Sequence, residues 1–257
     1  MPRFFIYLCS NSNNIKMKKN FLFLIAIIIC FSACKQTAPL VPLDPHFNEA
    51  CLHEHNPLLK DIEMEQLGLV DVSTLDEGII VQLVYCTPYN FMGKVLYHDI
   101  SRAYLQPDVA QKLLKAYKSL KKIRPDLTIV VYDAARPRSI QREMYDMVKG
   151  TEWDYYVANP DRGGLHNYGA AVDVTLIDGT GKTLDMGTPY DYFGAEANTD
   201  KENELVQKGR ITPRELENRL LLRKIMTEAG FRTVKSEWWH FNACSLDEAK
   251  TLYKIIE

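Results

Sequence analysis

The chain has 257 residues, of which 46% are hydrophobic and 25% charged, so it is long enough to bury a substantial core. Lys and Arg total 31 against 33 Asp and Glu, which gives a formal net charge of −2. A chain without a basic excess lacks the electrostatic footprint of a nucleic-acid-binding protein, and we expect no nucleic-acid partner. The sequence also contains no internal repeat and no glycine-rich phosphate loop.

The N-terminal segment, residues 1–34, resembles a bacterial lipoprotein signal. From Met17, a Lys pair precedes an apolar run that is short for a membrane span, and small residues precede Cys34. The resemblance implies that translation starts at Met17 and that Cys34 is lipidated. It also implies a lipid anchor in the cell envelope, on the periplasmic or outer face of a bacterial membrane. Phe31 departs from the usual signal, and the alternatives are a plain secretory signal or a single anchor helix.

Residues 35–59 contain four prolines and no sustained apolar period, which predicts an extended tether between the membrane and a domain at residues 60–257. Within the tether, Cys51, His53 and His55 stand at alternate positions. This pattern is compatible with a metal site, but we interpret it as incidental because alternation in a Pro-flanked segment is weak evidence.

Cysteines provide little information about the fold. With Cys34 lipidated, the mature chain keeps three others, Cys51, Cys86 and Cys244. An odd number allows one disulfide at most, and the sequence does not indicate which pair forms it.

The domain alternates strand-like and helix-like segments. β-branched, apolar stretches predict strands, whereas apolar residues at helical spacing, begun by Pro or closed by Gly, predict helices. The expected strands are 78–86, 126–134 and 170–178, and the expected helices are 107–123, 139–148, 212–230 and 246–256. Because no regular strand–helix–strand rhythm is present, we predict an α+β domain with a mainly antiparallel sheet flanked by helices.

One candidate site lies in GGLHNYGAAVDVTL, residues 163–176. Asp173 interrupts an otherwise apolar strand, and an unpaired buried carboxylate costs several kcal/mol. It therefore requires a cation, a metal or several donors, and His166 is a natural partner. A second histidine would complete a three-ligand zinc site with one position open for water. The alternative is a His–Asp hydrogen bond within the core.

The second stretch is VKSEWWHFN, residues 234–242. If this segment bends, Glu237 and His240 can face one cavity, with His240 as a metal ligand and Glu237 as a general base. In a flat strand the two side chains would point to opposite faces. The tryptophans between them, Trp238 and Trp239, are then interpreted as walls of a small pocket, with Trp238 contacting the substrate.

Together these stretches resemble a known family. H-x6-D, followed later by E-x-x-H and preceded by the Arg-Pro pair of YDAARPRS (132–139), is similar to the D-alanyl-D-alanine dipeptidases of the VanX type. That family shares the fold of D-Ala-D-Ala carboxypeptidases and of the Hedgehog signalling domain. The resemblance runs from about Tyr85 to Phe241 and includes the pieces YNFMGK, MGTPYDYF and EWWHF.

The resemblance implies one zinc ion per chain, held by His166, Asp173 and His240, with Glu237 as the catalytic base. It further implies that Arg136 stabilises the oxyanion; a surface or ion-pairing arginine is the alternative.

For the substrate, the resemblance implies that Asp191 receives the ammonium group and that Tyr85 lines the same pocket. The family usually has a Ser where this chain has Gly164, so contacts to the substrate carboxylate are expected to differ.

The implied activity is zinc-dependent hydrolysis of the D-alanyl-D-alanine dipeptide, in cell-wall turnover or in glycopeptide resistance. One alternative is a D,D-carboxypeptidase or endopeptidase acting on peptidoglycan stem peptides. A second is a binding module of the same fold without catalysis. The sequence does not indicate the oligomeric state.

Overall fold

The computed structural model describes residues 59–257. The signal, Cys34, and the tether residues Cys51, His53 and His55 lie outside this part, so the predictions about them stay predictions. Between residues 59 and 257, no helix is long and apolar enough to cross a membrane. Cys244 is buried and carries a free thiol.

The main sheet has five strands in the order β2-β4-β5-β7-β6. Three of its four pairings are antiparallel, and only β2 and β4 run parallel. Its strands are β2 (Ile80–Val81), β4 (Leu127–Asp133), β5 (Ala171–Asp178), β6 (Arg232–Thr233) and β7 (His240–Asn242). A separate two-stranded sheet pairs β1 (Val70–Asp71) with β3 (Tyr104–Leu105). The predicted α+β class with a mainly antiparallel sheet is confirmed.

The helices begin and end at recognisable local signals. In α6, Thr212 and Glu215 form a capping box and Gly230 ends the helix with a φ of 104°, a conformation that favours glycine. In α3, Pro107 occupies the first turn. The described helices are α2 (Leu59–Gln66), α3 (Pro107–Ile123), α4 (Arg138–Val148), α5 (Glu202–Gln207), α6 (Pro213–Ala229) and α7 (Leu246–Leu252).

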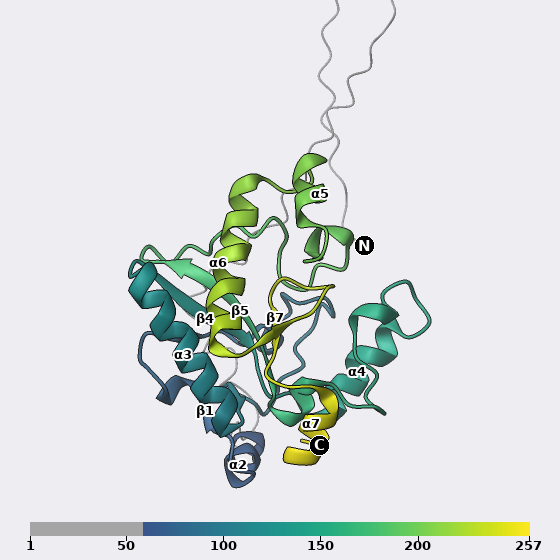
Figure 1. Ribbon diagram of the computed structural model, residues 1–257. Coiled ribbons are helices and arrows are strands. Elements are labelled where there is room, and N and C mark those ends of the chain that lie inside the picture. Colours follow the sequence, from purple (N-terminus) through teal and green to yellow (C-terminus); the bar gives the residue numbers. More distant parts are fainter. Residues whose placement is uncertain (1–58) are drawn as a thin grey trace, which may run out of the picture. The chain divides into compact units, whose positions relative to one another are not determined.

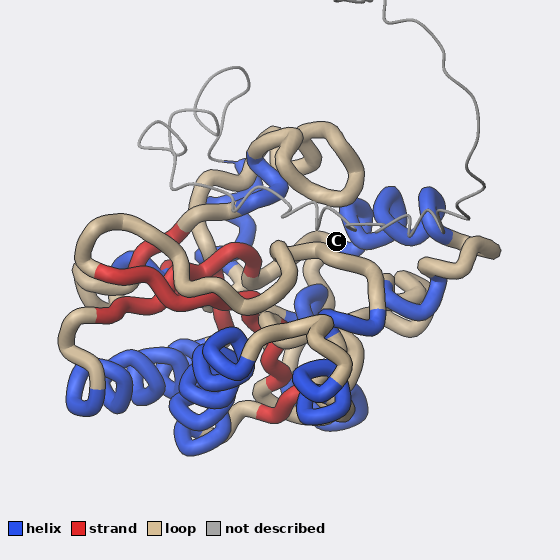
Figure 2. The backbone as a smooth tube through the Cα atoms, turned by 90° about the horizontal axis from the view of Figure 1, so that it is seen from above, coloured by secondary structure: helices blue, strands red, loops and turns tan. Residues whose placement is uncertain are grey.

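The core lies between the sheet and two long helices. α3 and α6 pack against each other (Figure 1), and Figure 2 shows both on the same side of the strands. Successive side chains of a strand point to opposite faces, so Val172 and Val174 pack into this core while Asp173, between them, faces the other side. The site therefore lies on the sheet face opposite α3 and α6.

Most predicted elements are present, with differences at their ends. The strand expected at 78–86 is only two residues long, because the chain turns into a 3₁₀ segment at Val84–Cys86. The terminal helix ends at Leu252 rather than 256. The structure adds elements that the pattern did not predict: α2, α5, the short strands β1, β3, β6 and β7, and the 3₁₀ segments Val72–Thr74, Asp154–Tyr156, Leu165–Tyr168 and Ala195–Ala197.

Candidate metal centre and active site

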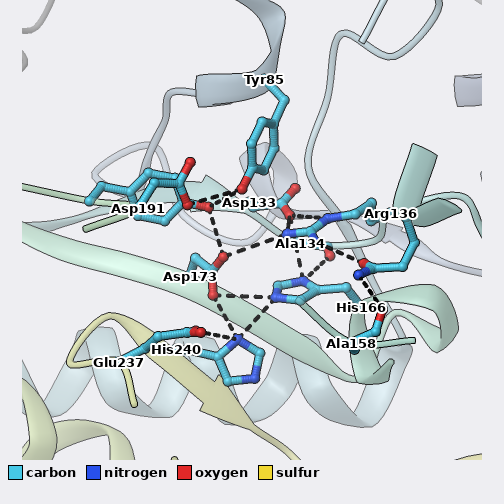
Figure 3. A network of polar contacts seen from close by, with 12 residues as sticks. Tyr85, Asp133, Ala134, Arg136, Ala158, His166, Asp173, Asp191, Glu237 and His240 are labelled. Atoms are coloured by element: carbon cyan, nitrogen blue, oxygen red, sulfur yellow. Dashed lines mark hydrogen bonds and ion pairs between the residues drawn. The ribbon is translucent and has the colours of Figure 1, made fainter. Parts of the chain in front are cut away.

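Three side chains converge on one point in a geometry that suits zinc (Figure 3). His166 Nε2 lies 3.3 Å from Asp173 Oδ1, His240 Nδ1 lies 2.9 Å from the same oxygen, and the two nitrogens are 3.1 Å apart. Ligands at about 2.0–2.1 Å in a tetrahedral zinc site are separated by roughly 3.3–3.4 Å. Two imidazole nitrogens and one carboxylate oxygen are also the donor types found in catalytic zinc sites. The residues therefore fit a zinc ion with small adjustments.

The sheet register brings two of these ligands together. Asp173 on β5 is the antiparallel partner of His240 on β7, and Asp133 on β4 is the partner of Asp173 on its other side. His166 reaches the same point from the 3₁₀ segment Leu165–Tyr168. Gly169 ends that segment with a φ of 64°, and a side chain there would collide with Leu69.

Glu237 lies beside the candidate ligands. The chain bends over Trp238 and Trp239 and enters β7 only at His240. The bend places Glu237 Oε2 3.9 Å from His240 Nδ1. The bent geometry that the spacing required is therefore present. Burial raises the pKa of Glu237 to about 7, even though the neighbouring His240 acts to lower it.

The charges of Asp173 and His240 stabilise each other. Burial raises the pKa of Asp173, but the adjacent His166 and His240 outweigh this effect and hold it well below its usual range. Burial lowers the pKa of His240, yet the hydrogen bond and charge of Asp173 raise it to about 9. Metal binding at His240 Nδ1 must displace a proton from this pair.

Arg136 is buried and held rigidly by its neighbours. Nε and Nη2 donate to Asp133 Oδ2 at 2.9 and 2.5 Å, and Nη1 donates to Gln141 Oε1 at 2.8 Å. The guanidinium lies over the ring of Tyr85, and Nη2 is 3.9 Å from Asp173 Oδ2. Burial opposes the charge of Arg136, but Asp133 holds its pKa well above the usual value. The arginine is not a surface residue; it presents a fixed positive charge to the cavity.

Asp191 forms another polar wall of the same cavity. Its Oδ1 accepts a hydrogen bond from the Tyr85 hydroxyl at 3.1 Å, and its Oδ2 lies 3.5 Å from the Phe91 amide nitrogen. In Figure 3, Asp191 and Tyr85 lie on one side of Asp173, and Glu237 lies on the other. Burial, reinforced by the charge of Asp173, raises the pKa of Asp191 well above its usual range. A cationic group beside Asp191 would stabilise the ionised carboxylate and lower its pKa again.

The cavity that these residues line has a volume of about 330 Å³, near the lower end for small-molecule pockets. Trp239 lines it, whereas Trp238 donates to Thr188 Oγ1 and lines a smaller space elsewhere. Trp238, which the sequence analysis expects to contact substrate, is therefore not among the residues that line this cavity, because the bend turns Trp239 towards it instead. The ring of Phe193 is stacked on the ring of Tyr156, with their centroids 4.9 Å apart, and adds an aromatic wall to the cavity.

Gly164 also lines the cavity. Its amide donates to Asn167 Oδ1, and a side chain at this position would approach Ala158 Cβ to 3.1 Å. The space that a serine would need is therefore partly taken by Ala158.

Several polar residues of the site were not identified from the sequence. Tyr190 donates its hydroxyl to Asp173 Oδ2 at 2.8 Å, and Asn242 Oδ1 lies 2.7 Å from His240 Nε2. Asp133 and Gln141 hold Arg136. The only local signal was their closeness in sequence to the named residues, because their roles depend on strand register and on a β-bulge between Val131 and Asp133.

Comparison with known proteins identifies the family of this chain. The family model described as D-ala-D-ala dipeptidase, within the M15 peptidases, matches residues 65–254. A D-alanyl-D-alanine dipeptidase of Escherichia coli is 33% identical over 173 residues, 67% of this chain and 83% of the relative. A protein of the same name from Enterococcus faecium is 27% identical over 194 residues, 68% of this chain and 91% of the relative.

Among solved structures, the vancomycin resistance D,D-pentapeptidase VanY in complex with Zn(II) aligns with a TM-score of 0.33 at 15% identity. The alignment covers 59% of this chain and 79% of that chain. This similarity is too low to bear on the site. The extent of the family match decides the assignment: the chain belongs to the D-Ala-D-Ala dipeptidase family of M15 peptidases, which are zinc metallopeptidases.

Proposed function

We propose that this protein is a zinc-dependent dipeptidase that hydrolyses free D-alanyl-D-alanine. The observation that carries the proposal is that His166, Asp173 and His240 converge within 2.9–3.3 Å of one another beside Glu237. Asp191 in the same cavity supports a substrate with a free amino group. The names of the E. coli and E. faecium relatives support the choice of substrate.

His166 Nε2, Asp173 Oδ1 and His240 Nδ1 would hold the zinc. When bound, zinc lowers the pKa of a water molecule in its open position and polarises the scissile carbonyl. Glu237 removes a proton from the attacking water as the water oxygen bonds to the carbonyl carbon. The same carboxyl then delivers that proton to the leaving nitrogen as the C–N bond breaks. A carboxylate positioned beside the attacking water and the leaving nitrogen can carry the proton between them.

Arg136 supplies fixed positive charge to the oxygen on which negative charge develops. A guanidinium stays ionised, and Asp133 and Gln141 keep it from reorganising during the reaction. Tyr85 packs against the guanidinium and donates to Asp191, so it links the two ends of the substrate site.

The decisive assay compares three substrates: D-Ala-D-Ala, its N-acetyl derivative and L-Ala-L-Ala. A dipeptidase that needs a free ammonium releases alanine from the first and only slowly from the second. Equal cleavage of the N-acetyl compound would favour a carboxypeptidase instead. No cleavage of any of the three by the zinc-loaded protein would favour a non-catalytic binding module.

We also propose that Cys34 is the lipidated mature N-terminus and that the domain acts at the cell envelope. Support comes from the sequence alone, through the Lys pair, the apolar run and the small residues before Cys34. The Cys34→Ser protein should leave the membrane fraction or persist as a precursor, because the acyl chains would provide the anchor. Normal processing with unchanged membrane retention would contradict the proposal.

A further inference from the structure

Each candidate ligand is fixed through an atom that does not face the metal point. His166 Nδ1 lies 2.5 Å from the carbonyl oxygen of Ala134, and Asp173 Oδ2 accepts from the Tyr190 hydroxyl. A carbonyl oxygen can only accept, so His166 must carry its proton on Nδ1 and leave Nε2 free for the metal. Figure 3 shows this backbone contact and the opposite ring nitrogen directed at Asp173.

In His240 the two ring nitrogens have exchanged roles: Nδ1 faces the metal point and Nε2 faces a supporting residue. Its Nδ1 faces Asp173 and its Nε2 lies 2.7 Å from Asn242 Oδ1. With the amide oxygen towards the ring, Nε2 must donate, which leaves Nδ1 without a proton when a metal binds. The two histidines thus present different nitrogens, Nε2 of His166 and Nδ1 of His240, to the same point.

The backbone explains why Asn242 can hold the ring firmly. Asn242 follows His240 by two residues on β7, so both side chains leave the same face of the strand. Asn242 pairs with Ala171 of β5 on one side and with Arg232 of β6 on the other. Its side chain therefore projects from backbone that is fixed by two neighbouring strands, and it lines the cavity.

We propose that Asn242 is a positioning residue that commits Nδ1 of His240 to the metal. The inference rests on the proposed zinc site. Asn242 touches neither the metal point nor the reacting atoms; it acts by accepting the Nε2 proton and by fixing the plane of the ring. Partners of this kind typically change metal affinity by about 10- to 100-fold when they are removed.

The first test measures the zinc dissociation constant by competition with a chelator at fixed pH. Asn242→Leu keeps the approximate size of the side chain and removes the acceptor, and it should weaken zinc binding about 10- to 100-fold. Asn242→Asp keeps an acceptor oxygen in place and should bind zinc within a few-fold of the parent, or more tightly. Thr233→Val, an isosteric change on the exposed strand β6, is the matched control and should leave zinc affinity unchanged.

A second readout uses the unaltered protein. Nitrogen-15 NMR of the zinc-loaded protein should place the His240 proton on Nε2, with slow solvent exchange that becomes faster in Asn242→Leu. A purely structural role for Asn242 would not alter that exchange. If the Leu variant does not fold, the position of the His240 proton in the parent and the zinc affinity of Asn242→Asp still test the role of Asn242.

Zinc affinity of folded Asn242→Leu within twofold of the parent, or zinc coordination through His240 Nε2, would overturn the inference. His166→Ala separates this result from failure of the proposed function. If His166→Ala loses zinc while Asn242→Leu keeps it, only the role of Asn242 fails. If His166→Ala keeps zinc at the parent affinity, the metal site itself is wrong.

Discussion

Asp173 and His240 face each other across two antiparallel strands, with Oδ1 of the carboxylate 2.9 Å from Nδ1 of the imidazole. The pairing of β5 with β7 sets this contact, so it depends on the backbone register and not only on the side chains. The bond to Asp173 also raises the pKa of His240 to about 9, so the metal-free pair holds a proton at neutral pH. A proton thus occupies the position that a metal would take.

The first prediction concerns the metal. His166→Ala or His240→Ala should lose most bound zinc, because three protein ligands are the usual number for a catalytic zinc site. His98→Ala, which changes an exposed histidine outside the cavity, is the control and should keep full zinc content. Elemental analysis of the purified proteins gives the result, and full occupancy in both site variants would refute the ligand assignment.

The second prediction concerns the base. Glu237→Gln should keep its zinc and lose about 10²- to 10⁴-fold in kcat, because the amide cannot accept the water proton. Glu217→Gln, on the exposed side of α6, should retain parent activity and serves as the control. Near-parent turnover by zinc-loaded Glu237→Gln would assign the base to another group.

The third prediction concerns stability and pH. Without metal, the fold raises the pKa of Glu237 from 4.5 to about 7, because burial favours the protonated carboxyl. The contribution of Glu237 to the free energy of unfolding is therefore fully present below pH 4.5 and is lost as pH rises through 7. Its side chain is only 15% exposed. Metal-free Glu237→Gln should therefore be more stable than the parent at pH 8, by up to about 3 kcal/mol.

Urea unfolding of the two metal-free proteins at pH 8 and at pH 4.5 checks this difference. The stabilisation should shrink to a small fraction of its value at pH 8, because at pH 4.5 the parent carboxyl is protonated in the folded state and half protonated in the unfolded state. A difference that does not change with pH would mean that ionisation of Glu237 is not its cause.

Two of the three candidate ligands, His166 and Asp173, could be placed together from the sequence because local structure brings them close. An aspartate between two valines of an apolar strand, and a histidine just before the glycine turn that leads into it, must lie near each other. The sequence could not decide between a hydrogen bond and a metal site for His166 and Asp173. That choice depended on where His240 lies, which only the pairing of β5 with β7 fixes.

The supporting residues could not be predicted, because their roles depend on long-range geometry. Asp133 is only three residues from Arg136, but the bulge in β4 sets which residue of β5 it faces, and that residue is Asp173. Tyr190 reaches Asp173 from a loop 17 residues later in the chain. The choice between Trp238 and Trp239 as the cavity wall depended on the direction of a bend, which spacing alone does not encode.

The last prediction tests substrate choice through Asp191. This residue has a φ of 59°, a left-handed conformation that asparagine tolerates as well as aspartate, so Asp191→Asn removes the charge without straining the backbone. If the carboxylate pairs with the ammonium of D-Ala-D-Ala, its loss should cost about 2–5 kcal/mol, or roughly a 30- to several-thousand-fold decrease in kcat/KM. For the N-acetyl derivative, which has no ammonium, the same substitution should change kcat/KM little or raise it, because an unpaired carboxylate no longer faces a neutral group. Asp185→Asn, which alters an exposed aspartate outside the cavity, is the control and should leave both substrates unaffected. An equal decrease in kcat/KM for the free and the acetylated dipeptide would mean that Asp191 supports the fold of the site and does not bind the ammonium group of the substrate.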